Sequence, residues 1–160
     1  MNDVSPSRLA AFLVEAKRRT YAGLDDDATI AVPLLPGSKQ LEHRTGDMLY
    51  RDIYFGMGFF VGQEIVQVGT RVIWSMSYAG GVSPGIGDRE ALLAIYAFLR
   101  KALLAVEEVR PFRGPLQLAE GDFRYINNAR GDLAEFHGEE EIHRAGSSVY
   151  ALRYQGGLIR

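Results

Sequence analysis

Two segments of the chain carry apolar residues at intervals of three and four positions, which is the spacing of one face of an α-helix. The first segment follows Ser5-Pro6, a serine N-cap with proline at the first helical position, and predicts a helix over about residues 6–20. The second follows Asp88, with Glu90 in the first turn, and predicts a helix over about residues 88–107. The apolar positions of the two helices are Leu9, Phe12, Leu13 and Ala16, then Leu92, Ile95, Leu99, Leu103 and Val106.

Aromatic and β-branched residues dominate the runs that lie between and after these helices, and glycine separates one run from the next. Such runs are typical of short antiparallel strands joined by tight turns. They predict two three-stranded meanders, at residues 50–55, 59–68 and 72–78, then at residues 123–127, 136–143 and 149–154.

The second meander repeats the first. A shift of 76 positions aligns residues 60–81 with residues 136–157 without a gap, and six of the 22 positions are identical. The identical residues are Phe60, Gly62, Glu64, Tyr78, Gly80 and Gly81, over Phe136, Gly138, Glu140, Tyr154, Gly156 and Gly157. One residue of slippage upstream also places Gly46-Asp47-x-x-Tyr50 over Gly121-Asp122-x-x-Tyr125. Self-similarity at a fixed period indicates a repeated structural unit.

We therefore predict an α+β fold, in which a tandem (αβββ)×2 pseudo-twofold repeat forms an antiparallel sheet with both helices packed on it. Residues 1–160 form a single domain in this interpretation. Repeat unit one covers about residues 6–81, and repeat unit two covers about residues 88–157.

Strand alternation assigns the faces of the predicted sheet. The odd-numbered residues of 135–143 are glutamates and histidines, which we expect to face water, so Glu140 projects to the other side. Glu64 is the repeat partner of Glu140 and takes the same orientation. The predicted inner face is an aromatic wall around these two carboxylates, formed by Trp74, Tyr78, Tyr150, Tyr154, Tyr50 and Tyr125.

A carboxylate on an apolar face costs several kcal/mol unless it is paired, hydrogen-bonded or protonated, so the two glutamates need an explanation. One explanation is structural: the glutamates accept hydrogen bonds from tyrosines or pair with an arginine such as Arg113, or a bulge at Gly62 or Gly138 turns them outward. The other is functional: the two units leave a cleft at the pseudo-twofold axis, where the acids hold a cationic or aromatic small molecule. Both explanations stay open at the level of the sequence.

Three functions follow from these alternatives. The first is an effector-binding or sensor-like domain with an acidic aromatic pocket, lined by Glu64, Glu140 and the six aromatic residues of the inner face. The second is a hydrolase in which Glu64 and Glu140 are the catalytic candidates, as acid and base. The third is a protein-interaction module without a pocket, in which a partner or a second copy docks and a homodimer forms.

The amino-acid composition excludes several kinds of site and of partner. The chain lacks cysteine, which excludes disulfides and thiolate metal sites and favours the cytoplasm. A net charge of −2 and a pI of about 5.9 predict no direct binding to nucleic acid. No apolar run approaches the roughly 18 residues that would span a bilayer, so we expect no membrane segment. The three histidines do not have the spacing of metal ligands, and we expect neither a metal nor a cofactor.

Two runs of like charge occur near the end of the first predicted helix. We interpret Lys17-Arg18-Arg19 as cations at the helix C-terminus and Asp25-Asp26-Asp27 as acids that solvate the following loop.

Several short motifs are spread over nearly the whole chain: Thr20-Tyr21-Ala22, Tyr54-Phe55-Gly56, Phe60-x-Gly62-Gln63-Glu64, Trp74-x-Met76-x-Tyr78-x-Gly80, Arg113-Gly114-Pro115 and Tyr154-x-Gly156-Gly157. In these motifs the chain resembles a bacterial family of domains of unknown function that are found alone or C-terminal to helix-turn-helix regulators of the XRE type. The resemblance implies a sensor or effector-binding role and assigns no activity. We expect no separate DNA-binding helices in this chain, so a regulatory role would need another protein.

The tandem architecture is also similar to that of the effector-binding domains of multidrug-sensing regulators, some relatives of which are hydrolases. This similarity concerns architecture alone.

Overall fold

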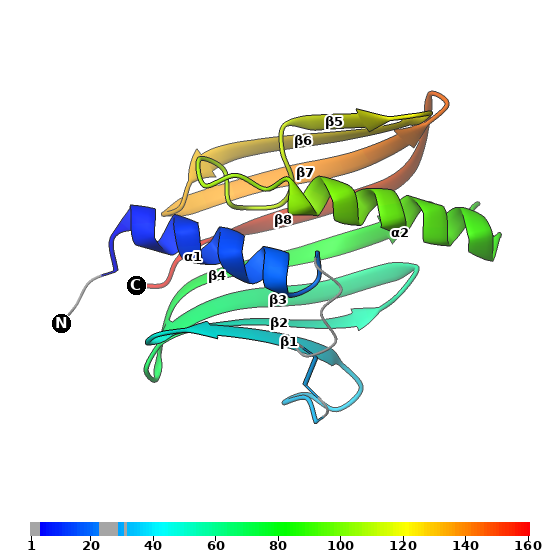
Figure 1. Ribbon diagram of the computed structural model, residues 1–160. Helices are drawn as coiled ribbons and strands as arrows, with labels where there is room; N and C mark the ends of the chain where they lie inside the picture. The colour runs from blue at the N-terminus through cyan, green and yellow to red at the C-terminus, as the bar shows by residue number, and fades with distance from the viewer. Residues whose placement is uncertain (1–3, 23–28, 31) are drawn as a thin grey trace.

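The computed structural model describes residues 4–22, 29–30 and 32–160. Two helices lie across one face of an eight-stranded antiparallel sheet with the strand order β1-β2-β3-β4-β8-β7-β6-β5 (Figure 1). The elements are α1 (Pro6–Arg19), β1 (Lys39–Thr45), β2 (Met48–Gly56), β3 (Phe59–Val68), β4 (Arg71–Val82), α2 (Arg89–Leu104), β5 (Gln117–Glu120), β6 (Phe123–Asp132), β7 (Glu135–Arg144) and β8 (Ser147–Leu158).

The predicted α+β tandem repeat is confirmed, and each unit contains one strand more than the sequence predicted. The additional strands are β1 and β5, which form the two edges of the sheet. β1 carries charged residues along much of its length, and β5 has four residues. Both features are usual for edge strands, and both weaken the apolar alternation by which a strand is detected.

The two units meet at the centre of the sheet, where β4 pairs with β8. Tyr78 is the Cα partner of Tyr154, its own repeat equivalent, so the pseudo-twofold axis passes between these two residues. The repeat extends to irregularities: the β3–β4 ladder shifts register after Val66, and the β7–β8 ladder shifts after Ile142, its equivalent.

Local sequence explains where the helices begin. The Ser5 side chain accepts a hydrogen bond from the backbone N–H of Arg8, and Pro6 occupies the first helical position of α1. The Asp88 side chain accepts from the N–H of Ala91 at the start of α2. Among the described residues, no helix is both long and apolar enough to cross a membrane.

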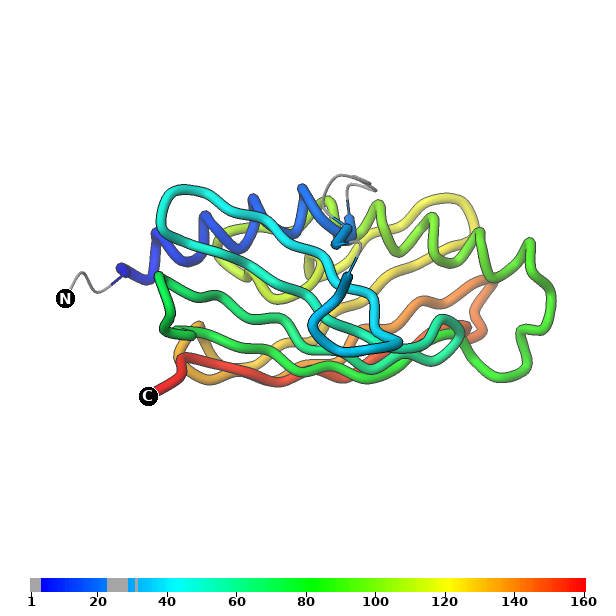
Figure 2. Tube along the Cα trace, turned by 90° about the horizontal axis from the view of Figure 1, so that it is seen from below, coloured from blue at the N-terminus to red at the C-terminus, as the bar shows by residue number. Residues whose placement is uncertain are grey.

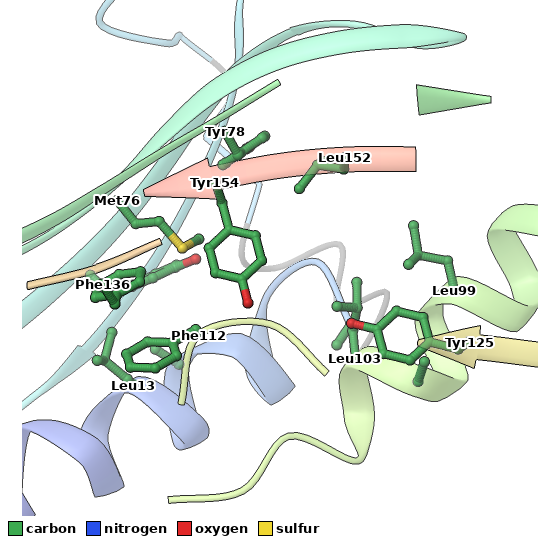
Figure 3. Close-up of a cluster of buried hydrophobic side chains, with 14 of the residues drawn as sticks. Leu13, Met76, Tyr78, Leu99, Leu103, Phe112, Tyr125, Phe136, Leu152 and Tyr154 are labelled. Carbon is green, nitrogen blue, oxygen red and sulfur yellow. The ribbon is translucent and has the colours of Figure 1, made fainter. Parts of the chain in front are cut away.

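The core lies between the helices and the concave face of the sheet. Seen from below, the outer strands rise toward the level of the helices while the central strands stay low, so the sheet forms a trough (Figure 2). Phe112 and Phe136 stack with ring centroids 4.0 Å apart, beside Leu13 of α1 and Met76 of β4 (Figure 3). The predicted inner-face orientation is correct for Glu64 and Glu140, whose residues are both 0% exposed.

Each unit places a tyrosine ring over a glycine of the neighbouring strand. Gly62 is opposite Tyr78 and Gly138 is opposite Tyr154, and a Cβ atom at either glycine would lie within about 2.4 Å of the facing ring. The repeated Phe-x-Gly-x-Glu motif is therefore explained by packing: glycine makes room for the ring, and glutamate follows two positions later on the same face.

Replacing Gly62 by alanine should destabilise the protein. The new Cβ would lie 2.3 Å from Tyr78 Oη, so the tyrosine must move and the free energy of unfolding should fall by roughly 1–3 kcal/mol in urea denaturation. Gly85→Ala is the matched control, because no atom lies within 4 Å of a Cβ there. Equal stability of the two variants would show that the ring does not need the glycine.

Candidate functional site

Glu140 of unit two is buried in a complete set of hydrogen bonds. Arg113 donates through Nη2 to Glu140 Oε1 at 2.6 Å, and Tyr150 donates to the same oxygen at 2.8 Å. Tyr125 donates to Oε2 at 2.6 Å. Burial raises the pKa of both tyrosines, and the nearby charge of Glu140 raises each pKa further, so both phenols stay protonated as donors.

The Arg113-Gly114-Pro115 motif holds this arrangement in place. The N–H of Gly114 donates to Tyr125 Oη at 3.0 Å, and the Gly114 carbonyl accepts from Asn127 Nδ2 at 2.9 Å. A Cβ at position 114 would lie 2.8 Å from Tyr125 Oη, so glycine permits the close approach. Tyr154 donates to Asn127 Oδ1 at 2.6 Å. Glu140 thus has the contacts that the structural explanation requires.

Glu64 of unit one has a different counter-ion. Lys17 of α1 forms a short hydrogen-bonded ion pair with Glu64 Oε2 and also donates to the Phe112 carbonyl at 2.9 Å. Both charged side chains are fully buried. Burial lowers the pKa of Lys17, and the charge of Glu64 opposes that shift.

All three cations of the basic run lie in the last turn of α1, as predicted, but Lys17 is also buried and paired with an acid. It lies four residues after Leu13 and eight after Leu9, so helical spacing places it on the apolar stripe that faces the sheet. Arg18, in the same turn, donates hydrogen bonds to the carbonyls of Leu104 and Val106. The acidic run at residues 25–27 lies outside the described residues.

Four buried side-chain atoms in the described part of the chain have no hydrogen-bond partner, and all four belong to unit one. They are Tyr21 Oη, Tyr50 Oη, Glu64 Oε1 and Trp74 Nε1. In unit two the equivalents of Tyr50 and Trp74 are Tyr125 and Tyr150, which both donate to Glu140. The polar groups of unit two therefore satisfy one another, whereas those of unit one do not.

Asp52 is a third buried acid that the site prediction did not include. It lies on β2 directly opposite Glu64 on β3, with its side chain on the same face. Tyr78 donates to Asp52 Oδ1 at 2.6 Å, and no donor among the described residues reaches Oδ2. Burial, and then the charge of Glu64, raise the pKa of Asp52 to about 7.

Asp52 also breaks the repeat. Its equivalent in unit two is Asn127, which lies opposite Glu140 in the same register and accepts the same hydrogen bond from the equivalent tyrosine. The alternation Tyr50-Asp52-Tyr54 and the upstream repeat alignment were the signals in the sequence that could have identified this carboxyl.

A pocket of about 290 Å³ lies between α2 and the half of the sheet that unit one forms, and we name it the unit-one pocket. Its buried lining residues include Asp52, Tyr78 and Arg113, which we call the floor. Tyr21 also lines it, and its ring lies 5.8 Å from Lys17 Nζ and 5.6 Å from Arg113 Cζ. Tyr21 is therefore close to the buried cations of both ion pairs, Lys17 of the Glu64 pair and Arg113 of the Glu140 pair.

The walls of the unit-one pocket are apolar and aromatic. Helix α2 contributes Leu92, Leu93, Leu99 and Leu103, and the strands contribute the rings of Tyr54 and Phe60. Tyr96 of α2 completes the wall, and its hydroxyl donates to the Met57 carbonyl, which ties the helix to the turn between β2 and β3. Two cations, exposed Lys39 and half-buried Arg100, lie at the outer part, which we call the rim.

The structure places the eight predicted site residues on the face that the helices cover, in three groups. Glu140, Tyr125 and Tyr150 lie around Arg113, and Tyr154 contacts Asn127 beside them. Glu64 and Trp74 lie beside Lys17, and Tyr50 lies within range of the charge of Glu64. Tyr78 is the predicted residue that lines the unit-one pocket. The predicted site residues did not include Lys17, Asp52 or Tyr21.

Comparison with known proteins identifies a family. Residues 52–159 match the model of a family described as Domain of unknown function (DUF5680). This range contains all the strands from β3 to β8, helix α2 and both repeated glutamates. Neither the curated proteins nor the solved structures yielded a match.

Removing the cation of unit one should be costly. Lys17→Met leaves the buried Glu64 without its ion-pair partner, and breaking a buried pair in this way typically costs about 3–5 kcal/mol. In chemical denaturation, adding Glu64→Gln to Lys17→Met should recover much of the loss. Arg19→Met is the matched control at an exposed cation and should change the stability by less than about 0.5 kcal/mol. A double variant as unstable as Lys17→Met alone would contradict the pairing.

Asp52 should make stability depend on pH. Because its pKa is raised from 3.8 to about 7 on folding, the unfolded chain releases this proton first, and stability is lost as pH rises through that range. The free energy of unfolding of the wild type, relative to Asp52→Asn, should therefore fall between about pH 4 and pH 7 and then level off. Urea denaturation at pH 4.5, 6 and 8 measures this difference. Parallel stability curves for the two proteins would show that Asp52 does not titrate as stated.

Proposed function

The chain belongs to the DUF5680 family, a domain of unknown function, and from the geometry of the unit-one pocket we propose that it binds a small amphipathic molecule. The observation that carries the proposal is the free oxygen of Asp52. Oδ2 belongs to a buried carboxyl that lines the pocket, and no described side chain hydrogen-bonds to it. Oδ2 is not one of the fully buried atoms without a partner, so it is accessible from the pocket, and an accessible acceptor without a partner in the described part of the chain supports binding of a donor.

The shape and lining of the pocket support the same proposal. Its volume of about 290 Å³ is near the lower end of the range for small-molecule sites. Leucines and aromatic rings form the walls, and a few polar groups lie at the floor, which is the usual composition of such sites. The walls would cover an apolar body, and Asp52 would orient the head of the molecule.

The asymmetry of the repeat favours unit one over unit two as the site. In unit two, Asn127 replaces the acid, and Glu140 accepts hydrogen bonds from three side chains of its own domain. The same positions in unit one retain a free carboxyl oxygen and four unpartnered buried atoms. Unit two stabilises the fold in this proposal, and unit one binds the ligand.

A sensor role would fit this binding function. The resemblance to domains that accompany XRE-type helix-turn-helix regulators supports it, and a separate DNA-binding protein would then read the bound state. Helix α2 and Tyr21 both line the pocket, so a ligand would contact α2 and the segment that follows α1. The lack of cysteine supports action in the cytoplasm.

The two other functions stay predictions. A hydrolase would use Glu64 and Glu140, each of which is hydrogen-bonded to a buried cation in the structure. An interaction module or homodimer would use an exposed face, and the outer side of unit one, where Phe55 and Val61 are 43% and 49% exposed, is the surface that favours it.

Blocking the pocket should remove ligand-dependent stabilisation. Leu93→Trp enlarges an exposed side chain of the lining, so small amphipathic compounds that raise the melting temperature of the wild type should no longer do so. A site filled at a hundred times Kd stabilises by about 2.7 kcal/mol, which thermal unfolding detects as a shift of several degrees. Leu104→Trp is the matched control on the same helix, at an exposed leucine outside the lining. Equal ligand shifts in both variants would place the binding elsewhere.

A further inference from the structure

The buried charges of the protein do not balance. Among the described residues, five charged side chains are buried: Lys17, Arg113, Asp52, Glu64 and Glu140. The two cations are each hydrogen-bonded to a glutamate, Lys17 to Glu64 and Arg113 to Glu140. Asp52 is the buried acid without a cation of its own, since its hydrogen-bond partner is the neutral hydroxyl of Tyr78.

We propose that the ligand of the unit-one pocket is an organic cation with one protonated nitrogen, which donates to Asp52 Oδ2. This inference rests on the proposed binding function and names the chemistry of the ligand. A protonated nitrogen supplies the missing counter-charge and the missing hydrogen bond to the same atom. The rings of Tyr54, Phe60 and Tyr96 in the wall add favourable contacts between a cation and aromatic faces.

The groups around Asp52 disfavour a ligand with an anionic head group. Glu64 lies opposite Asp52 on the neighbouring strand. The other groups near Asp52 include the phenols of four tyrosines, Tyr50, Tyr54, Tyr78 and Tyr21. An anionic head would therefore meet the Asp52 carboxyl at the floor, with the charge of Glu64 close to it. Arg113, the cation of the floor, is already paired with Glu140, and Lys17 is paired with Glu64.

The two cations of the rim favour a ligand with a single positive charge. Lys39 and Arg100 would repel a second cationic group at the outer part of the pocket. A molecule with one cationic head, directed inward, and an apolar body against the leucines of α2 matches the whole lining.

Binding at this carboxyl exchanges a proton with the solvent when the free protein holds Asp52 protonated. The acid then loses its proton to water and the carboxylate pairs with the ammonium group. The proton released offsets the charge of the ligand, so the complex carries the same net charge as the free protein. Because burial and Glu64 raise the pKa of Asp52 to about 7, cation binding should weaken as pH falls below 7, by up to tenfold per pH unit. A simple alkylamine keeps its own proton throughout this range.

Calorimetric titration of the whole chain with two matched series tests the proposal. Each series has one apolar body, hexyl or 2-phenylethyl, with an amine or an alcohol as its head, and hexanoate and 3-phenylpropionate serve as the anions. We expect the amines to bind at least tenfold more tightly than the alcohols at pH 8. That preference should shrink at pH 5.5, and titrations at pH 6 in two buffers of different ionisation enthalpy should reveal proton release.

Asp52→Asn separates the carboxyl from the rest of the pocket. Unit two shows that asparagine fits this position beside a tyrosine, because Tyr154 and Asn127 form the equivalent hydrogen bond. The variant should lose the preference for amines and keep the affinity for the alcohols. Comparison of head groups on the wild type tests the proposal independently of how well the variant folds.

The results of these titrations distinguish a failure of the cation inference from a failure of the proposed binding function. If alcohols bind as tightly as amines, or anions bind most tightly, the cation inference is wrong while small-molecule binding stands. If Asp52→Asn binds amines as the wild type does, another group holds the nitrogen, and the inference is again wrong. If no member of either series binds at millimolar concentration, both the inference and the proposed amphipathic pocket are overturned.

Discussion

The burial of a glutamate on the inner face of each repeat unit is the constraint on which the arrangement of the helices depends. A carboxylate removed from water needs a counter-ion and hydrogen bonds, and breaking such a pair costs several kcal/mol. Lys17 of α1 supplies the cation for Glu64, and Arg113, which follows α2, supplies it for Glu140. Each ion pair therefore ties a segment outside the sheet to a strand beneath it, and Lys17 also holds the Phe112 carbonyl of the loop that leads to Arg113.

The two units share a sequence pattern but differ in how their buried polar groups are hydrogen-bonded. In unit two, Tyr125, Tyr150 and Arg113 satisfy both oxygens of Glu140, and Asn127 accepts a hydrogen bond from Tyr154. Unit one carries Asp52 in place of the asparagine and Trp74 in place of the second tyrosine, and its buried polar atoms remain partly unsatisfied. The pocket lies beside the less satisfied unit, under α2. Under the proposed function, the repeat would let one unit contribute stability while the other tolerates the unfavourable burial that a binding site requires.

Much of the fold could be predicted from the sequence, because its signals are local. Helix starts at Ser5-Pro6 and Asp88, the alternation of β3 and β7, and the repeat of Phe-x-Gly-x-Glu depend on neighbouring residues and on strand geometry. The edge strands β1 and β5 lacked such signals, since polar residues and short length disguise their alternation. The site was harder to predict. Lys17 and Tyr21 lie at or just after the end of α1 and Asp52 lies on β2, so their proximity depends on how α1 crosses the sheet.

The sequence by itself determined that the chain contains two related α+β units, each with one glutamate that alternates onto the same strand face as a set of aromatic residues, because strand alternation and the repeat fix which side chains share a face. Tertiary structure alone decided which cation pairs with each acid, and that Asp52 has none, because ion pairing depends on distances between segments that are far apart along the chain. It also decided that the pocket lies in unit one, since side chains of α2 and of β2, β3 and β4 together line it. The sequence shows which residues carry a charge, whereas the folded structure determines which of these charges are buried and whether they are paired.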